Sequence, residues 1–398
     1  MSGKQFFYVS EYNLQKEVMW QFKPPDQLKI YDTTLRDGEQ TIGVAFDKLD
    51  KMKIAQALDD LGVQRIEAGM PVVSAEDKIA VEAILNMGLK AEIWGFCRAV
   101  KKDVRTCMEI GVKHLICEIA TSDIKMRANG FTKEKVLRRL VDCLQFAKKN
   151  NIYVAFFAVD ATRTKLDFLK EAYLTAVNEG GADEVVVVDT LGVATPETMF
   201  FLTRKVKQWV DVPVMTHCHN DFGMGVACTL SSVKAGAEYA QVTMNGLGEK
   251  TGNADLAEVA IAAQLYGIPV AVDMKKLFPV AQLVENITKI PLSPLKPVTG
   301  KNVFIKESGV TVAQVITYPP SVEGFSPEIL GRERGIVLGK KSGKKSINYK
   351  LKAFGLNATD EQIDGILAEV KALGLEKKGL VSDDEFKKIV SKKIKLNK

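Results

Sequence analysis

Short apolar runs alternate with stretches of helical spacing over the first two thirds of the chain. Eight runs have the length and residue types of buried strands: 28–32, 63–69, 90–97, 113–122, 152–160, 183–190, 212–218 and 237–244. Between them, stretches such as 48–62 and 133–150 carry apolar residues at the spacing of an amphipathic helix. Eight strand–helix units over about 240 residues predict an α/β fold, a (β/α)8 TIM barrel.

The polar residues support this prediction. In such a barrel the chemistry collects where the parallel strands end, whereas a doubly wound open sheet, the alternative fold, usually has fewer strands. Polar or charged groups follow nearly every predicted strand, and the opposite ends mostly lack them. The strand ends carry 32–40, Glu67, 122–125, 160–163, 189–190, 217–221 and 245–253. This asymmetry favours the barrel.

The alternation stops after about residue 270, where Pro291, Pro294 and Pro297 mark a linker-like region. Residues 360–372 and 382–396 have helical patterning and open with acidic residues, as helix N-termini prefer. We therefore expect a smaller, mostly helical C-terminal domain after the barrel. The expected parts are an N-terminal extension (1–27), the catalytic barrel (28–275), a linker with a small subdomain (276–345) and a helical subdomain (346–398).

Composition excludes several classes of function. The 398 residues are 46% hydrophobic and 26% charged, which is ordinary for a soluble globular protein. The net charge of +6 comes largely from Lys-rich runs in the last quarter, which fit a solvated helical face better than a nucleic-acid patch. No apolar run reaches membrane length and the N-terminus lacks a signal-peptide pattern. The six cysteines are scattered without a CxxC, so we expect the reducing cytoplasm.

Two of the three histidines lie at the end of the seventh predicted strand. Positions i and i+2 of a strand face the same way, so His217 and His219 point together. Two solvated loop histidines are the plainer alternative, but a divalent metal site fits better, with oxygen ligands from elsewhere. The best acidic candidate is Asp37, after the neighbouring first strand, although Arg36 and Asp37 would also suit a surface ion pair.

The glycine-rich stretch 245–253, NGLGEKTGN, follows the last strand of the barrel. It lacks the GxGxxG spacing, so it is a weak signal for a dinucleotide site. A mobile loop over the site is the better interpretation. Its last residue, Asn253, is a candidate oxygen ligand and equally a candidate N-cap for the helix expected to start near it.

Taken together, these motifs resemble the DRE-TIM metallolyase family. The matching segments are LRDGEQ, IEAGMP, DATRT, DTLG, HCHNDFGMG and NGLGEKTGNADL, in this order. The family includes 2-isopropylmalate, homocitrate, citramalate and Re-type citrate synthases and, more distantly, 3-hydroxy-3-methylglutaryl-CoA lyase. FIKESGVTVAQ and LGKKSGKKSI resemble segments after the barrel in the synthase branch, so the resemblance covers roughly residues 28–395.

The resemblance implies a divalent metal (Mg, Mn or Zn) held by Asp37, His217 and His219, with Asn253 as an additional ligand. It implies an acyltransferase that joins acetyl-CoA, the co-substrate, to a 2-oxo acid in a Claisen-type condensation, so that the acyl group becomes alkyl on transfer. It also implies a homodimer, in which the segment 304–314 reaches the partner's active site.

The resemblance assigns further roles around the metal. Arg36 would stabilise negative charge on the reacting oxygens, and Glu67 would act near the metal, directly or through water. Thr190 would hydrogen-bond the substrate carboxylate, and Arg163 of DATRT joins it in the expected substrate-binding set.

Several positions depart from the family pattern. The histidine of SDIHM is Lys125, the glutamate of SAEDA is Val159, and the two histidines of HxSGIH are Lys306 and Thr311. The histidine replaced by Thr311 usually has an acid–base role, delivered from the partner subunit. The proton-abstracting base of this chain therefore has no candidate from the resemblance.

These departures change the expected charge of the pocket. Lys125, Lys306 and Lys341 each replace a histidine, and Val159 removes a negative charge. If these lysines lie in the pocket and not at the surface, it carries additional cations. Additional cations suit a substrate with more carboxylates. We therefore expect Lys125 and Lys306 to bind a 2-oxo diacid such as oxaloacetate or 2-oxoglutarate, as in a Re-citrate or homocitrate synthase. A carbon–carbon lyase or aldolase on the same barrel and a non-catalytic ligand-binding relative remain as alternatives.

Overall fold

The computed structural model describes residues 6–394. The chain forms two compact units. One, the barrel unit, is Ser10–Leu292, and the other, the C-terminal unit, comprises Met1–Val9 and Ser293–Lys398, of which 6–9 and 293–394 are described. The finer boundaries expected within residues 276–398 stay a prediction. No helix in the described part of the chain is long and apolar enough to cross a membrane.

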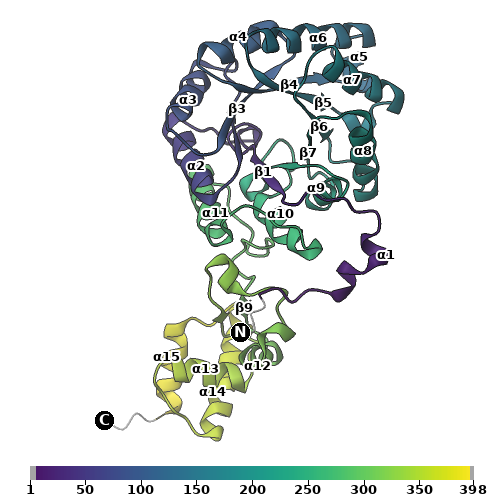
Figure 1. Ribbon diagram of the computed structural model, residues 1–398. Helices are drawn as coiled ribbons and strands as arrows, with labels where there is room; N and C mark the ends of the chain where they lie inside the picture. Colours follow the sequence, from purple (N-terminus) through teal and green to yellow (C-terminus); the bar gives the residue numbers. More distant parts are fainter. Residues whose placement is uncertain (1–5, 395–398) are drawn as a thin grey trace. The chain divides into compact units, whose positions relative to one another are not determined.

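The barrel unit contains a closed barrel of eight parallel strands in sequence order (Figure 1). The strands are β1 (Lys29–Asp32), β2 (Arg65–Gly69), β3 (Glu92–Arg98), β4 (His114–Ala120), β5 (Tyr153–Val159), β6 (Glu184–Asp189), β7 (Val214–Cys218) and β8 (Tyr239–Val242). Four residues of β1 pair with four of β8, which closes the ring. Each strand overlaps the apolar run predicted for it, and the predicted (β/α)8 barrel is confirmed.

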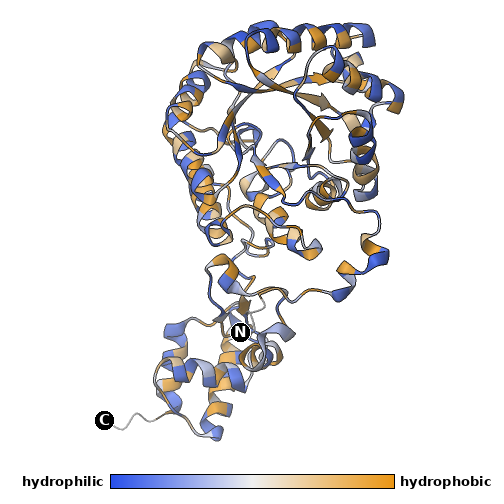
Figure 2. Ribbon diagram, viewed as in Figure 1, coloured by the Kyte–Doolittle hydropathy of each residue, from blue (hydrophilic) through white to orange (hydrophobic). Residues whose placement is uncertain are grey.

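Helices surround the strands on the outside of the barrel (Figure 1). They are α2 (Lys48–Leu61), α3 (Ala75–Leu85), α4 (Lys101–Glu109), α5 (Asp123–Ala128), α6 (Lys133–Lys149), α7 (Leu166–Asn178), α8 (Pro196–Trp209), α9 (Gly225–Lys234), α10 (Leu256–Ala262) and α11 (Met274–Thr288), with the short α1 (Lys16–Met19) before β1. In α6 the buried residues Val136, Leu140, Cys143, Leu144 and Ala147 lie on one face, as an amphipathic helix requires. Figure 2 shows this mixture of hydrophobic and hydrophilic positions along the helices.

The interior of the barrel is filled by a cluster of side chains: Tyr31, Trp94, Phe96, Ile116, Ala155, Phe157, Val186, Val188, Met215 and Tyr239. Successive side chains of a strand alternate between the interior and the surrounding helices. The residues two positions beyond this cluster therefore face the mouth at the C-terminal ends of the strands. On β3, β4 and β5 they are Arg98, Glu118 and Val159.

The other end of the barrel contains a buried ion pair. Arg65 Nη1 and Nη2 each donate to a Glu184 carboxylate oxygen at 2.8 Å, and Arg65 Nε donates to Glu92 at 2.8 Å. The guanidinium lies 3.7 Å from the ring centre of Tyr239. These charges are exceptions to the expectation that strand beginnings mostly lack them. The buried arginine is tolerated there because two carboxylates neutralise its charge.

The C-terminal unit is mostly helical, as predicted. It contains the short parallel pair β9 (Ile305–Lys306) and β10 (Gly335–Ile336), and the helices α12 (Gly309–Thr317), α13 (Lys344–Ala353), α14 (Asp360–Glu376) and α15 (Asp383–Lys393). Capping boxes begin α14, with Thr359 and Gln362, and α15, with Ser382 and Glu385. Leu338, Ile347, Ile366, Val370 and Phe386 belong to a separate core in this unit.

Candidate metal and active site

The candidate ligands Asp37, His217 and His219 converge at the C-terminal mouth of the barrel. The end of β7 places the two imidazoles, and the loop after β1 places the carboxylate. His217 Nε2 lies 3.3 Å from Asp37 Oδ2, and His219 Nε2 lies 3.8 Å from the same oxygen. One ligand atom from each of the three buried residues lies within 4.8 Å of the others. The alternative of two solvated loop histidines is wrong, because both are buried.

Two buried oxygens at this site lack a hydrogen bond. Among residues 6–394, Asp37 Oδ1 and Asn253 Oδ1 are buried without a partner. Such oxygens are costly in a protein interior, and a divalent cation between them would satisfy both. Asn253 Nδ2 donates to the Leu247 carbonyl at 3.0 Å, which leaves Oδ1 as its free end. Carboxylate, amide and imidazole donors fit Mg, Mn or Zn, and metal binding here stays a prediction.

Neighbouring groups prepare the histidines to act as ligands. His217 Nδ1 lies 3.1 Å from Gln241 Oε1, and a proton on Nδ1 leaves the lone pair of Nε2 facing Asp37. Burial, and then the charge of His217, lower the pKa of His219 to about 3, so this imidazole is neutral near pH 7. Burial disfavours the Asp37 carboxylate, but Arg36 and then the two histidines outweigh it and hold the pKa of Asp37 well below its usual value.

Arg36 is fixed between two carboxylates. Its Nε donates to Glu67 and its Nη1 donates to Asp37 Oδ2 at 2.8 Å. The guanidinium carbon lies 4.0 Å from the ring centre of Phe96. Its Nη2 is buried and donates to no group in the described chain. The alternative of a surface ion pair is therefore wrong, and the free Nη2 donor suits negative charge that develops during a reaction.

Glu67 uses both oxygens to hold its neighbours. Oε1 accepts from Arg36, and Oε2 accepts from the Tyr31 hydroxyl at 2.8 Å. In this arrangement Glu67 positions the guanidinium, and its expected action near the metal stays a prediction. Tyr31 and Gln241 were not predicted from the sequence, because each lies within an apolar run where polar residues have no distinguishing spacing.

Asn253 does not cap a helix. The N-cap of α10 is Asp255, whose side chain accepts from the Glu258 N–H. The N-cap alternative for Asn253 is therefore wrong. Its backbone instead forms an antiparallel bridge with His219, which places the amide beside the candidate ligands.

The glycine-rich loop packs against the candidate ligands. A Cβ on Gly248 would lie 2.2 Å from Asn253 Nδ2 and 3.2 Å from Asp37 Oδ1, and the φ of Gly248 is +153°. Only glycine allows this close approach without a shift of the loop. The loop therefore contributes to the geometry of the candidate ligands.

The residues expected to bind substrate have different surroundings. Thr190 Oγ1 accepts from the Asp160 N–H at 2.8 Å. Arg163 donates to the Asp160 carboxylate through Nε and Nη2, at 2.9 and 2.8 Å, so its charge is already paired. Lys306 lies on β9 of the C-terminal unit, and its role stays a prediction. Lys341 is 70% exposed and pairs with Glu307 at 3.2 Å, so it gives no support to a cationic pocket.

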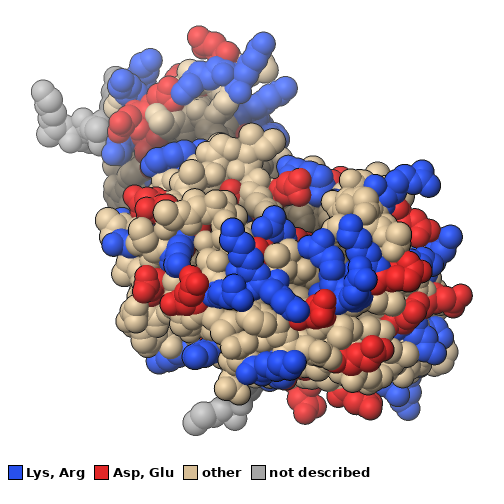
Figure 3. Space-filling model, turned by 90° about the horizontal axis from the view of Figure 1, so that it is seen from above, with Lys and Arg blue, Asp and Glu red and all other residues tan. Residues whose placement is uncertain are grey.

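Lys125, on α5, lines a cavity of about 410 Å³ at the ends of β3, β4 and β5. Arg98, Arg139, Glu118 and Val159 also line it. A smaller hollow of about 270 Å³ shares Arg139 and has two more lysines. Figure 3 shows Lys and Arg side chains gathered on the face that α4 and α6 cover. The basic residues of these two helices are Lys101, Lys102, Arg105, Lys133, Lys135, Arg138, Arg139, Lys148 and Lys149.

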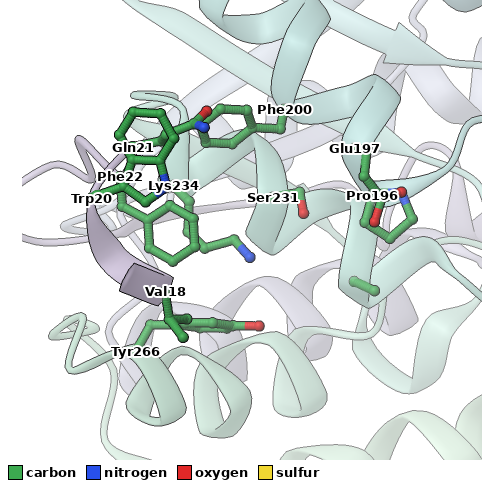
Figure 4. Close-up of a pocket in the computed structure, with 11 residues that line it drawn as sticks. Val18, Trp20, Gln21, Phe22, Pro196, Glu197, Phe200, Ser231, Lys234 and Tyr266 are labelled. Atoms are coloured by element: carbon green, nitrogen blue, oxygen red, sulfur yellow. The ribbon is translucent and has the colours of Figure 1, made fainter. Parts of the chain in front are cut away.

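A third hollow, of about 550 Å³, lies between the N-terminal segment and the helices α8 and α9 (Figure 4). Lys234 Nζ lies 4.6 Å from the ring centre of Phe22 and 4.4 Å from that of Tyr266. None of the candidate site residues lines this hollow. Its contacts hold residues 18–22 against the barrel.

Comparison with known proteins gives consistent matches over most of the chain. Residues 27–284 match the HMGL-like family model, and residues 298–378 match the model of a homocitrate synthase post-HMGL domain. A homocitrate synthase of Methanothermobacter thermautotrophicus is 39% identical over 96% of this chain and 97% of its own length. A 2-isopropylmalate synthase of Methanocaldococcus jannaschii is 41% identical over 96% of this chain and 75% of its own length.

Further matches extend the comparison. An (R)-citramalate synthase of Methanocaldococcus jannaschii is 41% identical over 87% of this chain and 71% of its own length. A solved structure of hydroxymethylglutaryl-CoA lyase from Pseudomonas aeruginosa has a TM-score of 0.61 at 20% identity, over 68% of this chain and 95% of that one. The last match shows a shared fold alone.

Proposed function

Because this chain belongs to the HMGL-like family and is an enzyme of its synthase branch, we propose that it condenses acetyl-CoA with a 2-oxo acid in a metal-dependent Claisen-type reaction. The observation that carries this proposal is the buried site in which Asp37, His217 and His219 converge beside the free Nη2 of Arg36. Residues at the strand ends supply every part of this site, where barrel enzymes carry their chemistry.

The names of the relatives support the reaction type. Homocitrate, 2-isopropylmalate and citramalate share a carboxymethyl group on a tertiary alcohol carbon that also bears a carboxylate. An acetyl group that adds to the keto carbon of a 2-oxo acid leaves this substructure. The synthase relatives are 39–41% identical, which favours condensation over the lyase or aldolase alternative.

The side chains around the site would divide the work. A bound divalent metal would supply Lewis acidity to the carbonyl of the 2-oxo acid. Arg36 Nη2 would donate to the oxygen that gains negative charge, with Glu67 and Asp37 holding the guanidinium from two sides. Thr190 Oγ1 already accepts one hydrogen bond, so its own proton is free to be donated to the substrate carboxylate.

We further propose that the 2-oxo acid is a diacid such as oxaloacetate or 2-oxoglutarate. Lys125 and Arg139 line the cavity of about 410 Å³, and no carboxylate among the described residues forms an ion pair with either. Their charges would bind a distal carboxylate. Phe96 and Phe157 face the barrel interior, where methylene groups of the substrate would pack between its two carboxylates.

The same aromatic pair favours a second candidate. Phe96 and Phe157 have ring centres 5.6 Å apart, and Phe157 lies 5.2 Å from the ring of His217. An apolar wall this close to the candidate ligands would also suit an aliphatic 2-oxo monoacid. The substrate would then extend toward the aromatic rings, and the lysine would not contact it.

Release of free CoA thiol tests the proposal. The purified protein is incubated with acetyl-CoA, Mg²⁺ or Mn²⁺ and each member of a panel of 2-oxo mono- and diacids. We expect thiol release that requires both the 2-oxo acid and the metal and is fastest with a diacid. Fastest release with a branched monoacid would select the second candidate, and no release with any 2-oxo acid would contradict condensation.

A further inference from the structure

A condensation of this kind needs a base, and two positions that carry one in the resembled family are Val159 and Thr311 here. Neither side chain can accept a proton from a carbon acid. The barrel unit nevertheless has a carboxylate at the mouth of the barrel. Glu118 lies on β4, two residues beyond the core residue Ile116, so its side chain faces inward.

Glu118 lies next to the position of Val159. In the register of β4 and β5, Glu118 pairs with Phe157 and Ala120 pairs with Val159. Glu118 and Val159 line the same cavity. One strand thus supplies a carboxylate close to the place where the neighbouring strand lacks one.

The Glu118 carboxylate is uncommitted, unlike other carboxylates at this end of the barrel. Glu67 accepts from Arg36 and Tyr31, and Asp160 accepts from Arg163 and Ser122. Glu118, which is partly buried, accepts no side-chain hydrogen bond from the residues that the structure describes. Its oxygens are therefore available to a substrate in the cavity.

Several charged groups from neighbouring elements lie near Glu118. Arg36 follows β1, Arg98 lies on β3, Asp103 on α4 and Lys125 on α5, and Arg139 of α6 lines the same cavity. Burial raises the pKa of Glu118, and Asp103 adds to this, while Arg36, Arg98 and Lys125 oppose it. A raised pKa makes the carboxylate a stronger base, and the neighbouring cations favour its ionised form.

We propose that Glu118 is the catalytic base that accepts a methyl proton of acetyl-CoA. The C–H electron pair becomes the C=C bond of the enolate while the thioester C=O π pair moves onto its oxygen. That oxygen pair re-forms the thioester carbonyl as the enolate carbon bonds to the keto carbon of the 2-oxo acid. The carbonyl π pair moves onto the former keto oxygen, which takes the proton back from Glu118. Water then hydrolyses the thioester and CoA leaves as the thiol. This inference rests on the proposed condensation.

Glu118→Gln tests the inference because it keeps the shape and removes the base. Thiol release by the unchanged protein is measured first, so that failure of the condensation itself is seen separately. We expect kcat to fall by about 10²–10⁴-fold, with the KM of the 2-oxo acid changed little. We also expect a larger primary isotope effect with methyl-deuterated acetyl-CoA, and loss of the acidic limb of the kcat–pH profile.

Two further variants separate catalysis from structure. Glu118→Gln combined with Val159→Glu should recover part of kcat, because the carboxylate returns on the neighbouring strand. Glu134→Gln makes the same change on the exposed side of α6 and should leave kcat unchanged. Unchanged kcat in Glu118→Gln would overturn the inference. So would a raised KM with an unchanged isotope effect and no recovery, since Glu118 would then only position Arg98 and Lys125.

The melting temperature of Glu118→Gln shows whether this variant folds. If it does not fold, Glu118→Asp tests the inference in its place. The shorter carboxylate keeps the charge but withdraws the base from the substrate. Reduced kcat with a larger isotope effect would support the inference, and full kcat with an unchanged isotope effect would overturn it.

Discussion

Three unpartnered polar atoms lie at the candidate site: Asp37 Oδ1, Asn253 Oδ1 and Arg36 Nη2. Two are acceptors and one is a donor, and each costs stability while it has no partner. Together they fit a cation and an oxyanion bound next to each other. At the scale of single residues, the site is therefore prepared for ligands of both charges.

The first prediction concerns the metal. Replacing His217 with alanine removes one nitrogen ligand, and we expect it to abolish stoichiometric binding of Mn²⁺ or Zn²⁺ measured by calorimetry. Because a ligand that binds only the folded state stabilises it, the metal should raise the melting temperature of the unchanged protein and not that of the variant.

The third histidine provides the matched control. His114 begins β4 at the opposite end of the barrel, where its ring stacks on Trp94 at 5.4 Å. His114→Ala should keep full metal binding although it loses that contact. Equal loss of metal binding in both variants would contradict the assignment of His217 as a ligand.

The second prediction concerns Lys125. Lys125→Met keeps the length of the side chain and removes its charge. Loss of a charge-assisted hydrogen bond to a distal carboxylate should cost about 1.5–3 kcal/mol, or roughly 10- to 150-fold in kcat/KM for a diacid. Monoacid substrates should be affected much less, because they lack that carboxylate.

Lys149→Met is the control for charge alone, since Lys149 ends α6 on the exposed surface. Its kcat/KM should match that of the unchanged protein on both substrate classes. If Lys125→Met lowers activity equally on diacids and monoacids, Lys125 has a different role in the reaction. If it changes neither, Lys125 does not bind a carboxylate of the substrate.

At the scale of elements, alternation of apolar runs and amphipathic stretches was sufficient to predict the strands. Each strand end then predicted candidate residues, and this brought Asp37, His217 and His219 together correctly. Partners from other strands could not be predicted in this way. Gln241 and Tyr31 contact the site through the register of β8 and β1, which local sequence does not encode.

Two other outcomes depended on packing. The N-cap of α10 falls on Asp255 because Asn253 and Asp255 first form bridges with the residues just after β7 and β8, and the helix begins only beyond them. Glu118 is the only acidic residue of the apolar run 113–122, and it has the inward phase of Ile116. The inward direction of this side chain could be predicted from the sequence, but the cavity that it lines could not.

The third prediction concerns the glycine-rich loop. Gly248→Ala would place a methyl group 2.2 Å from Asn253 Nδ2, so the loop must shift away from the candidate ligands. We expect metal affinity to fall by about 10- to 100-fold, as for the loss of other groups that orient metal ligands. Calorimetric titration with Mn²⁺ measures this change.

Gly130→Ala separates backbone strain from displacement of the ligands. Gly130 also has a positive φ, +62°, but a Cβ there would meet no atom within 4 Å. Both variants should lose stability from the strained backbone, by about 1–3 kcal/mol. Only Gly248→Ala should lose metal affinity, and unchanged affinity in that variant would show that the loop does not support Asn253.

At the scale of the whole molecule, the expected functional residues are divided between the two units. Arg36, Asp37 and the histidines belong to the barrel unit, whereas Lys306 and Thr311 belong to β9 and α12 of the C-terminal unit. The resemblance implies that the segment 304–314 completes the site of a partner subunit. A homodimer with two shared sites is therefore our last prediction.

Mixed dimers test this arrangement. Asp37→Asn disables the barrel unit and Lys306→Met disables the C-terminal unit, so each variant alone should lose most of its thiol release. The two are co-expressed with different affinity tags and purified through both.

If the segment acts across the dimer, one of the two sites combines an intact barrel unit with an intact C-terminal unit, so the mixed dimer should recover about half of the unchanged activity. If the segment acts within its own chain, each subunit has one disabled unit and nothing is recovered. A protein that is monomeric by light scattering and fully active in thiol release would contradict the prediction. Full activity of Lys306→Met alone would also contradict it.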